Sequence, residues 1–225
     1  MNFTTKTTLV VFFITVFCSA KQFKLHDHEQ RKYLLQSDKK ELFKFVGCQY
    51  LNFVKRADVE FNKIDPTKTQ WYLHYWTINQ EFVQKYYHDI MHYRLAPMYV
   101  RWISSDMGYG VFANRDIAKD EFLGVCAGEV RSMLDENRKL IQNYTYIWEF
   151  PFQTCDGARF CVDGRRFGNE IRFINHNDRD PNAKHIYVLI DGFVYTCYVA
   201  MQNIAKDSEI TSSYGDGPWV EDDFE

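Results

Sequence analysis

Apolar residues at three- and four-residue steps predict two helices in the first half of the chain. The first pattern starts after Asp38, which can cap a helix, and uses the positions Leu42, Phe45 or Val46, Tyr50, Phe53 and Ala57. Asp65-Pro66-Thr67 then interrupts it, because proline cannot continue a helix. The second pattern ends before Pro97 and consists of Trp71, Tyr75, Ile78, Phe82, Tyr86, Ile90 and Tyr93. We therefore expect residues 21–96 to be helical, as a hairpin or small bundle whose aromatic faces need another surface to pack on.

From Met98 the pattern changes to short β-rich segments separated by Gly, Asn and Asp. The expected strands cover residues 98–103, 110–113, 122–126, 186–190 and 194–200. One further helix is expected near residues 132–142. The fold class predicted from this order is α+β, with a helical region followed by a β-rich one.

Composition supports a packed globular protein and argues against several classes of function. Apolar residues make up 46% of the chain and aromatic residues 17%, which is enough for a core. The net charge of −3 argues against direct nucleic-acid binding. An acidic tail over residues 216–225 suits attraction to a basic peptide, or is simply a solvated chain end.

The first 20 residues have the pattern of a signal peptide. Lys6 precedes an apolar run from Leu9 to Phe17, and Cys18-Ser19-Ala20 ends in small residues that suit a signal peptidase. The run has about half the roughly 20 residues that a membrane-spanning helix needs, so no stable membrane span is expected. Removal of Cys18 leaves five scattered cysteines, an odd number that argues against a disulfide scaffold. Export with reduced thiols suggests an effector secreted by a bacterium and acting inside a host cell or its nucleus.

Three stretches of the second half carry the candidate chemistry. They are the turn Gly108-Tyr109-Gly110, the run Arg172-Phe173-Ile174-Asn175-His176 that Pro181-Asn182 follows, and the segment Glu209-Ile210-Thr211-Ser212-Ser213-Tyr214-Gly215. Between them lie Gly128-Glu129-Val130, Tyr146-Ile147-Trp148-Glu149-Phe150 and the run from Val162 to Asn169. This ordered set resembles the SET family of protein lysine methyltransferases. The resemblance implies a β-rich SET fold over residues 97–215, with a C-terminal pseudoknot against the Asn-His loop.

The resemblance also implies a cofactor and roles for individual residues. S-adenosylmethionine is the implied methyl donor, held by Gly108, Tyr109 and Gly110, by Asn175 at its methionine end and by the backbone of His176 at its adenine. Tyr214 is implied as the catalytic tyrosine that orients the lysine amine. Tyr146 adjoins both cofactor and lysine by resemblance, although a buried strand aromatic is the competing interpretation.

Departures from the family pattern affect the expected lysine channel. Many relatives have aromatic residues where this chain has Cys126 and Ser212. We therefore expect a wider channel and di- or trimethylated product. The usual Ser-Cys after Asn-His is replaced by Asn177-Asp178, with a longer spacer. Relatives often close the pocket with a zinc-binding cysteine cluster, and Trp219 could serve as a lid in its place.

The implied substrate is a lysine in a histone tail or another basic protein. A SET-shaped module that binds a peptide or partner protein without turnover is the main alternative, and small Cys126 and Ser212 are its support. His88-Asp89-Ile90-Met91-His92 imitates the HExxH helix of zinc proteases, but Asp is shorter than the Glu needed there and no third ligand is identifiable. His26-Asp27-His28-Glu29 is expected to be an exposed charged segment, so no metal is assigned.

Overall fold

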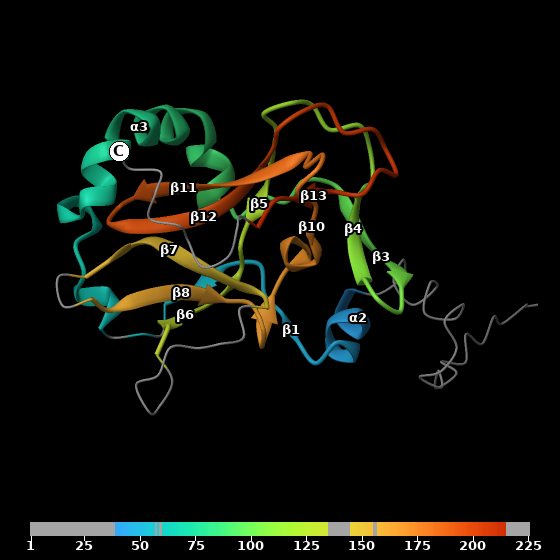
Figure 1. Cartoon of the computed structure of the whole chain (residues 1–225), viewed down its shortest axis with the longest axis horizontal. Helices are drawn as coiled ribbons and strands as arrows, with labels where there is room; N and C mark the ends of the chain where they lie inside the picture. The colour runs from blue at the N-terminus through green and yellow to red at the C-terminus, as the bar shows by residue number, and fades with distance from the viewer. Residues whose placement is uncertain (1–38, 57, 59, 135–144, 155–156, 215–225) are drawn as a thin grey trace, which may run out of the picture.

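A computed structural model describes residues 39–56, 58, 60–134, 145–154 and 157–214 (Figure 1). The helices are α2 (Lys39–Phe45) and α3 (Gln70–Met91), with 3-10 turns η1 (Phe61–Lys63), η2 (Pro66–Lys68) and η3 (Glu170–Phe173). The strands are β1 (Gln49–Tyr50), β2 (Val54–Lys55), β3 (Met98–Ser104), β4 (Gly108–Ala113), β5 (Phe122–Val125), β6 (Gly128–Ser132), β7 (Ile147–Gln153), β8 (Arg159–Asp163), β9 (Phe167–Gly168), β10 (Asn175–His176), β11 (Ala183–Ile190), β12 (Phe193–Ala200) and β13 (Thr211–Ser212).

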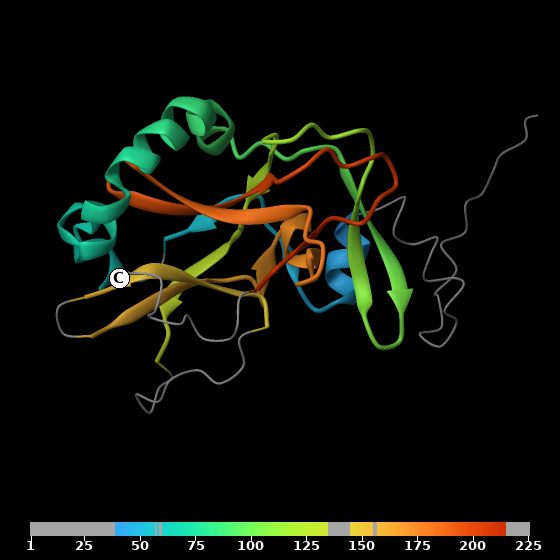
Figure 2. The ribbon, with the colours of Figure 1, turned by 45° about the horizontal axis from the view of Figure 1, so that its top comes forward.

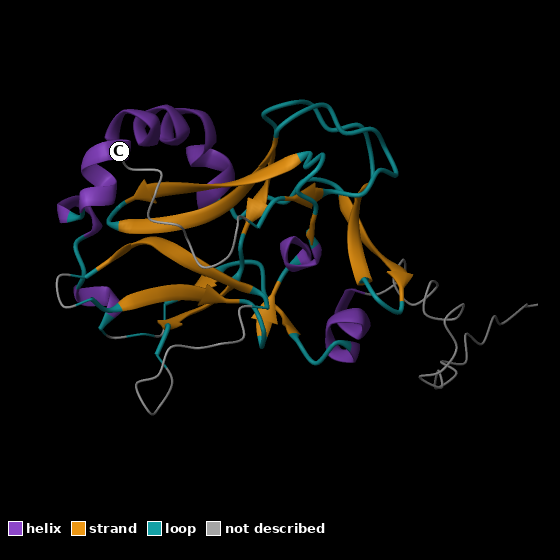
Figure 3. Cartoon of the chain, viewed as in Figure 1, coloured by secondary structure: helices purple, strands orange, loops and turns teal. Residues whose placement is uncertain are grey.

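Four small sheets organise these strands, as the orange ribbons of Figure 3 show. The largest has the order β10-β13-β11-β12-β5, and a second has the order β2-β6-β8-β7. A β3–β4 hairpin and a parallel β1–β9 pair complete the set. Phe61 in η1 joins the two larger sheets, because its ring stacks on Phe150 of β7 at 4.8 Å and meets Phe193 of β12 at 5.7 Å. The β-rich fold expected for the second half is confirmed.

The long helix α3 confirms the second helical pattern. Asp65 caps the preceding turn through its side chain, and the Thr69 hydroxyl accepts the Tyr72 N–H at the start of α3. Its aromatic face packs on the sheets, with Trp71 beside Tyr187 of β11 and Tyr86 beside Phe122 of β5. The aromatic face of α3 therefore packs against another surface, as expected from the sequence.

One position of the α3 pattern was wrong. Ile78 is 44% exposed, whereas its neighbour Asn79 is buried. The Asn79 side chain donates to the Leu189 carbonyl at 3.2 Å and accepts the Leu189 N–H at 2.7 Å. A side-chain amide can replace a neighbouring strand in this way, so Asn79 satisfies the backbone at the outer edge of β11.

The first helical pattern holds only as far as Phe45. Gly47 has a φ of +69° and lies just after α2, where the Cys48 N–H donates to the Phe43 carbonyl. A left-handed glycine is a common helix end, and it turns the chain into β1. Gln49 and Tyr50 then pair with β9, and β2 pairs with β6. The helix predicted through Tyr50 and Phe53 was therefore wrong, while Asp38 and Ala57 lie outside the described residues.

The two helices do not form the expected hairpin. Figures 1 and 2 place α2 beside the β3–β4 hairpin, at the end of the molecule away from α3. The Phe45 ring of α2 meets Tyr109 of β4, and α3 contacts β11, β5 and β7. Short strands within residues 49–55 join the sheets of the second half, so the two halves share one packed structure.

All five strands expected from the sequence are present, each within three residues of the expected bounds. The other strands were not predicted; they are β1, β2, β6, β7, β8, β9, β10 and β13. The helix expected near residues 132–142 does not begin at Ser132, which ends β6, and residues 135–144 lie outside the described residues. The signal-like residues 1–20, Trp219 and the acidic tail also lie outside them. Within the described part of the chain, no helix is long and apolar enough to cross a membrane.

The C-terminal segment is inserted between two strands that are consecutive in the chain. β13 lies between β10 and β11, which the loop of residues 177–182 connects. Asn182 in this loop donates its backbone N–H to the Thr211 carbonyl at 3.1 Å, and its side chain donates to the Glu209 carbonyl at 2.8 Å. Ile210, which directly precedes β13, donates its N–H to the Val111 carbonyl of β4. This is the pseudoknot that the family resemblance implied.

Candidate functional site

The three stretches that the sequence singled out meet at Asn175. Its side-chain amide donates to the Tyr109 carbonyl at 3.2 Å and to the Glu209 carboxylate at 2.8 Å. One residue thus links the glycine turn, the Asn-His run and the C-terminal segment. The convergence is a product of the fold, since more than 60 residues separate Tyr109 from Asn175 along the chain.

The two glycines of the turn are needed for different reasons. Gly108 has a φ of +71°, a conformation that favours glycine. At Gly110 an added Cβ would lie 2.7 Å from the Glu209 carboxylate oxygen and 3.0 Å from the Asn175 amide nitrogen. Gly110 therefore lets β4 come close enough for the Asn175 hydrogen bonds to form.

Tyr109 stands in an aromatic cluster beside this junction. Its ring lies 4.9 Å from Trp102, 6.1 Å from Phe173 and 6.3 Å from Phe45, all in edge-on arrangements. Such arrangements pair the positive edge of one ring with the negative face of another. The cluster fixes the Tyr109 backbone that accepts from Asn175.

Tyr214 is anchored to the Asn-His run at two points. Its hydroxyl donates to the Ile174 carbonyl at 2.6 Å, and its backbone N–H donates to His176 Nδ1 at 3.0 Å. Burial of the phenol raises the pKa of Tyr214 to about 12, and the nearby Tyr146 and Glu209 act in the same direction. The residue as a whole is 53% exposed, so the phenol is shielded while part of the side chain faces solvent. The hydroxyl is therefore neutral at physiological pH.

Tyr146 lies directly before β7, with a φ of +60°. This left-handed conformation is strained for a residue with a side chain and is often found at functional sites. Tyr146 is 37% exposed, which rules out a buried strand aromatic. Tyr146 lies close enough to contribute to the raised pKa of Tyr214, so the two phenols are in the same region.

Arg172 is a site residue that our sequence analysis did not select. Its guanidinium lies 3.9 Å over the Tyr146 ring, and the residue is only 5% exposed. Its buried Nε and Nη1 have no hydrogen-bond partner among the described residues. Unpaired buried charge is costly, so these nitrogens are suited to an anionic group of a ligand. The signal was present, because Arg172 begins the run that contains Asn175 and His176.

The two small channel residues are both buried. Cys126 ends the β5 region and is fully buried, and Ser212 of β13 is 1% exposed. Tyr198 of β12, which the sequence did not indicate, is buried, and its phenol lies close to Cys126, Ser212 and Trp148. Burial raises the pKa of Tyr198, so its hydroxyl stays protonated. Trp219, the third predicted channel residue, lies outside the described residues.

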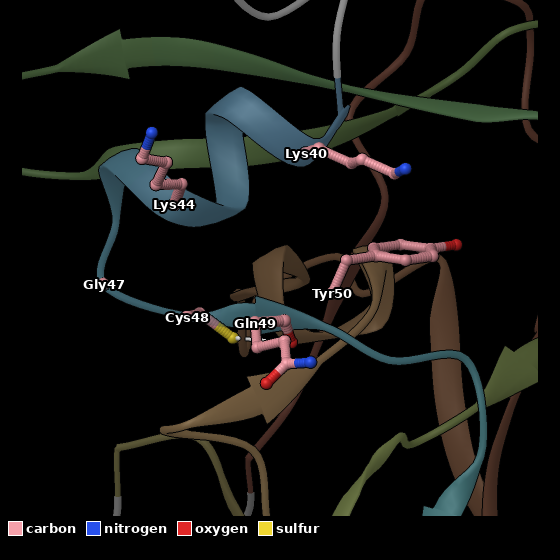
Figure 4. A pocket seen from close by; sticks show the side chains of 6 residues that line it. All are labelled: Lys40, Lys44, Gly47, Cys48, Gln49 and Tyr50. Carbon is pink, nitrogen blue, oxygen red and sulfur yellow. Dashed lines mark hydrogen bonds between the residues drawn. The ribbon is translucent and has the colours of Figure 1, made fainter.

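Two other features do not contribute to this site. The His88 and His92 rings stack at 4.2 Å, and Asp89 pairs with Arg94. In the described residues no three His, Cys, Asp or Glu side chains group as metal ligands. A surface pocket beside α2, shown in Figure 4, contains none of the residues selected from the sequence; it is lined by Lys40, Lys44, Gly47, Cys48, Gln49 and Tyr50.

Comparisons with known proteins agree with this geometry. The SET domain family matches residues 108–215. The histone-lysine N-methyltransferase ash1 of Drosophila melanogaster is 26% identical over 125 residues, covering 56% of this chain and 6% of that protein. The histone-lysine N-methyltransferase mes-4 of Caenorhabditis elegans is 32% identical over 124 residues, covering 48% of this chain and 13% of that protein. The chain thus spans a small part of these curated relatives.

A solved structure shows the same fold. ATXR5, crystallised in complex with histone H3.1 mono-methylated on R26, superposes with a TM-score of 0.60 at 17% sequence identity. The match covers 87% of this chain and 93% of the ATXR5 chain. Residues 108–215 are therefore a SET domain, and the curated proteins that this region resembles are histone-lysine methyltransferases.

Proposed function

We propose that this protein transfers a methyl group from S-adenosylmethionine to a lysine ε-amine of another protein. The observation that carries the proposal is the junction at Asn175 and the adjacent His176, which brings Tyr109, Glu209 and Tyr214 together. A site for methyl transfer must bind the donor, position a neutral amine behind the methyl and exclude water.

The residues present suit the cofactor. S-adenosylmethionine supplies a methyl group on a sulfonium, ready for in-line displacement. Arg172 has unpaired buried nitrogens that match the carboxylate of a methionine moiety, and the exposed part of Tyr146 lies beside them. Asn175 and Gly108 to Gly110 would hold the methionine end, and the His176 backbone would meet the adenine.

Tyr214 is the principal catalytic residue in this proposal. Because its proton is donated to Ile174, its oxygen lone pairs are free to accept from the lysine amine or to contact a polarised methyl group. The raised pKa keeps Tyr214 neutral over the working range of pH. A lysine with an ordinary pKa of about 10.4 loses its proton more readily in a desolvated site beside a cation, so no dedicated base is needed.

We propose a histone tail or another basic protein as the substrate, in line with the names of the relatives. Small Cys126 and Ser212 leave room for methyl groups, which favours di- or trimethylated product. Export through the signal-like residues 1–20, followed by action inside a host cell, is also proposed. The sequence pattern alone supports that part.

The test compares wild type with Tyr214→Phe on purified histones with labelled S-adenosylmethionine. We expect kcat to fall roughly 100-fold, as when one oriented donor is removed from an active site. Tyr87→Phe on the exposed face of α3 is the matched control and should keep full activity. Equal rates in all three proteins would remove Tyr214 from its role. Cofactor binding by calorimetry with no transfer to any protein would favour the binding module instead.

A further inference from the structure

We propose that Asp178, His176 and Ser213 form a clasp that positions Tyr214 for catalysis. This inference rests on the proposed function and adds two positioning residues, Asp178 and Ser213, to it. Asp178 lies where the chain departs from the sequence pattern that it otherwise resembles. Neither is a catalytic residue, because each acts through the polypeptide that carries Tyr214.

The clasp is a continuous chain of hydrogen bonds. Ser213 donates its hydroxyl to one Asp178 carboxylate oxygen at 2.7 Å, and His176 Nε2 lies 2.8 Å from the other. His176 Nδ1 in turn lies 3.0 Å from the Tyr214 backbone nitrogen. The three side chains therefore join the loop after β10 to the segment after β13.

The geometry dictates one tautomer of His176. A backbone N–H can only donate, so Nδ1 must be the acceptor for Tyr214. The ring proton then resides on Nε2, where it is donated to Asp178. Among the neutral forms, Asp178 thus favours the tautomer whose Nδ1 can accept from Tyr214, and hydrogen bonds to Ser213 and His176 lower the pKa of the Asp178 carboxyl.

Tyr214 needs this support because the strand ladder stops before it. The last paired residues of β10 and β13 are His176 and Ser212. The clasp extends the contact by two residues, and the His176 ring packs on the Tyr214 ring at 5.0 Å. Together these contacts hold the Tyr214 hydroxyl on the Ile174 carbonyl.

Histidine NMR tests the clasp without any need for activity. In full-length protein labelled with ¹⁵N-histidine and ¹⁵N-tyrosine, we expect the His176 signals of an Nε2–H tautomer and slow exchange of the Tyr214 amide. Asp178→Ala should shift His176 toward a mixture of forms and speed that exchange roughly 10-fold or more, because one net hydrogen bond is lost. Asp180→Ala, in the same loop, is the control, since the Asp180 side chain contacts Gln202 at 3.5 Å and is not part of the clasp.

Kinetics then tests the positioning role. We expect Asp178→Ala to lower kcat roughly 10- to 100-fold with little change in the KM for S-adenosylmethionine, because misplacement of a reacting group affects the chemical step. Asp178→Asn should recover most of the rate, since its amide can accept from His176 and donate to the Ser213 hydroxyl.

An unchanged His176 tautomer and Tyr214 exchange rate in Asp178→Ala would overturn the clasp. So would an equal loss of kcat in Asp178→Ala and Asp180→Ala. If no variant or wild-type protein transfers methyl groups, the proposed function fails on its own account, and the NMR comparison still decides whether the clasp holds Tyr214.

Discussion

At the scale of single residues, Arg172 is the most informative side chain of the site. It is buried and charged, and two of its nitrogens have no hydrogen-bond partner within the described ranges. Its stacking on Tyr146 compensates part of the desolvation, because an aromatic face attracts a cation. A residue kept for stability would be paired, so Arg172 is better explained by a ligand.

We predict opposite effects of Arg172→Met on binding and on stability. Affinity for S-adenosylmethionine should fall roughly 10- to 100-fold, the equivalent of one charge-assisted hydrogen bond. The cofactor-free protein should be as stable as wild type or more so, because an unpaired buried charge is replaced by an apolar chain of similar length. Calorimetry and urea unfolding measure the two quantities.

Arg131→Met serves as the control for this prediction. The Arg131 side chain is 42% exposed and pairs with Asp163, which also binds Arg165. This change should leave cofactor affinity unaltered and affect stability only slightly. Loss of stability in Arg172→Met without any change in affinity would show that Arg172 is a structural residue.

At the scale of elements, β12 determines what lies beside the two small channel residues. Alternate side chains of a strand face opposite sides of the sheet. Tyr198 therefore points toward Ser212 and Trp148, while Tyr195 lies on the other side and binds Arg56 through its hydroxyl. A lysine channel beside Ser212 would thus be bounded on one side by a phenol that can hydrogen-bond an amine.

We predict that Tyr198→Phe increases the share of trimethylated product. A hydroxyl that accepts from an amine N–H favours states that still have such a hydrogen, and a trimethylated amine has none. Removal of one net hydrogen bond of this kind should raise the trimethyl to dimethyl ratio roughly 2- to 10-fold. Mass spectrometry of a methylated histone peptide gives this ratio.

Tyr195→Phe on the opposite side of β12 is the matched control. It removes a hydroxyl from the same strand without touching Ser212, so the ratio should stay at the wild-type value. A change of equal size in both variants would point to a general loosening of β12 and away from the channel.

At the scale of the whole molecule, several ionisable side chains are buried in their neutral forms. Burial raises the pKa of Cys126 and Cys197 well above 9.0, and that of Cys161 to about 12. In the unfolded chain these thiols ionise near pH 9. The unfolded state therefore binds fewer protons than the folded state in alkaline solution.

We predict that the free energy of unfolding falls as the pH rises from about 9 to 10.5. Each thiol that ionises only in the unfolded chain lowers it by about 1.4 kcal/mol per pH unit. Below pH 8 these groups are protonated in both states and have no such effect. Urea unfolding in the presence of a reductant measures how steeply the free energy of unfolding falls with pH. Cys197→Ala should make this slope smaller by the contribution of one thiol. A slope of zero above pH 9 would contradict the burial of the thiols.

Some of the site could be predicted from the sequence because it depends on local chemistry. Gly108 occupies a left-handed turn, and Asn175, His176 and Tyr214 appear in runs whose order is distinctive. Strands such as β3 and β12 follow from β-branched and aromatic residues between turn formers. Helix α3 follows from its periodicity and from the Thr69 cap.

Other features depended on partners that are distant in the chain. Tyr50 continues an apolar helical period, but Gly47 ends α2 and β9 supplies a strand with which β1 pairs. Asn79 is buried because Leu189 offers an unpaired backbone edge. Our sequence analysis selected neither Arg172 nor Tyr198 as a site residue. Only the fold places the Arg172 guanidinium over the Tyr146 ring and the Tyr198 phenol close to Ser212.

The sequence by itself determined that this is an α+β protein with a SET domain, because turn residues, caps and the order of short motifs act locally. Only the tertiary structure decided which groups form the site. Insertion of β13 between β10 and β11 brings the Tyr214 hydroxyl to the Ile174 carbonyl. It also lets the Asp178 carboxylate reach His176 and Ser213. The physical reason is that hydrogen bonds and burial depend on distances in space, which strand pairing sets between residues that lie far apart in the chain.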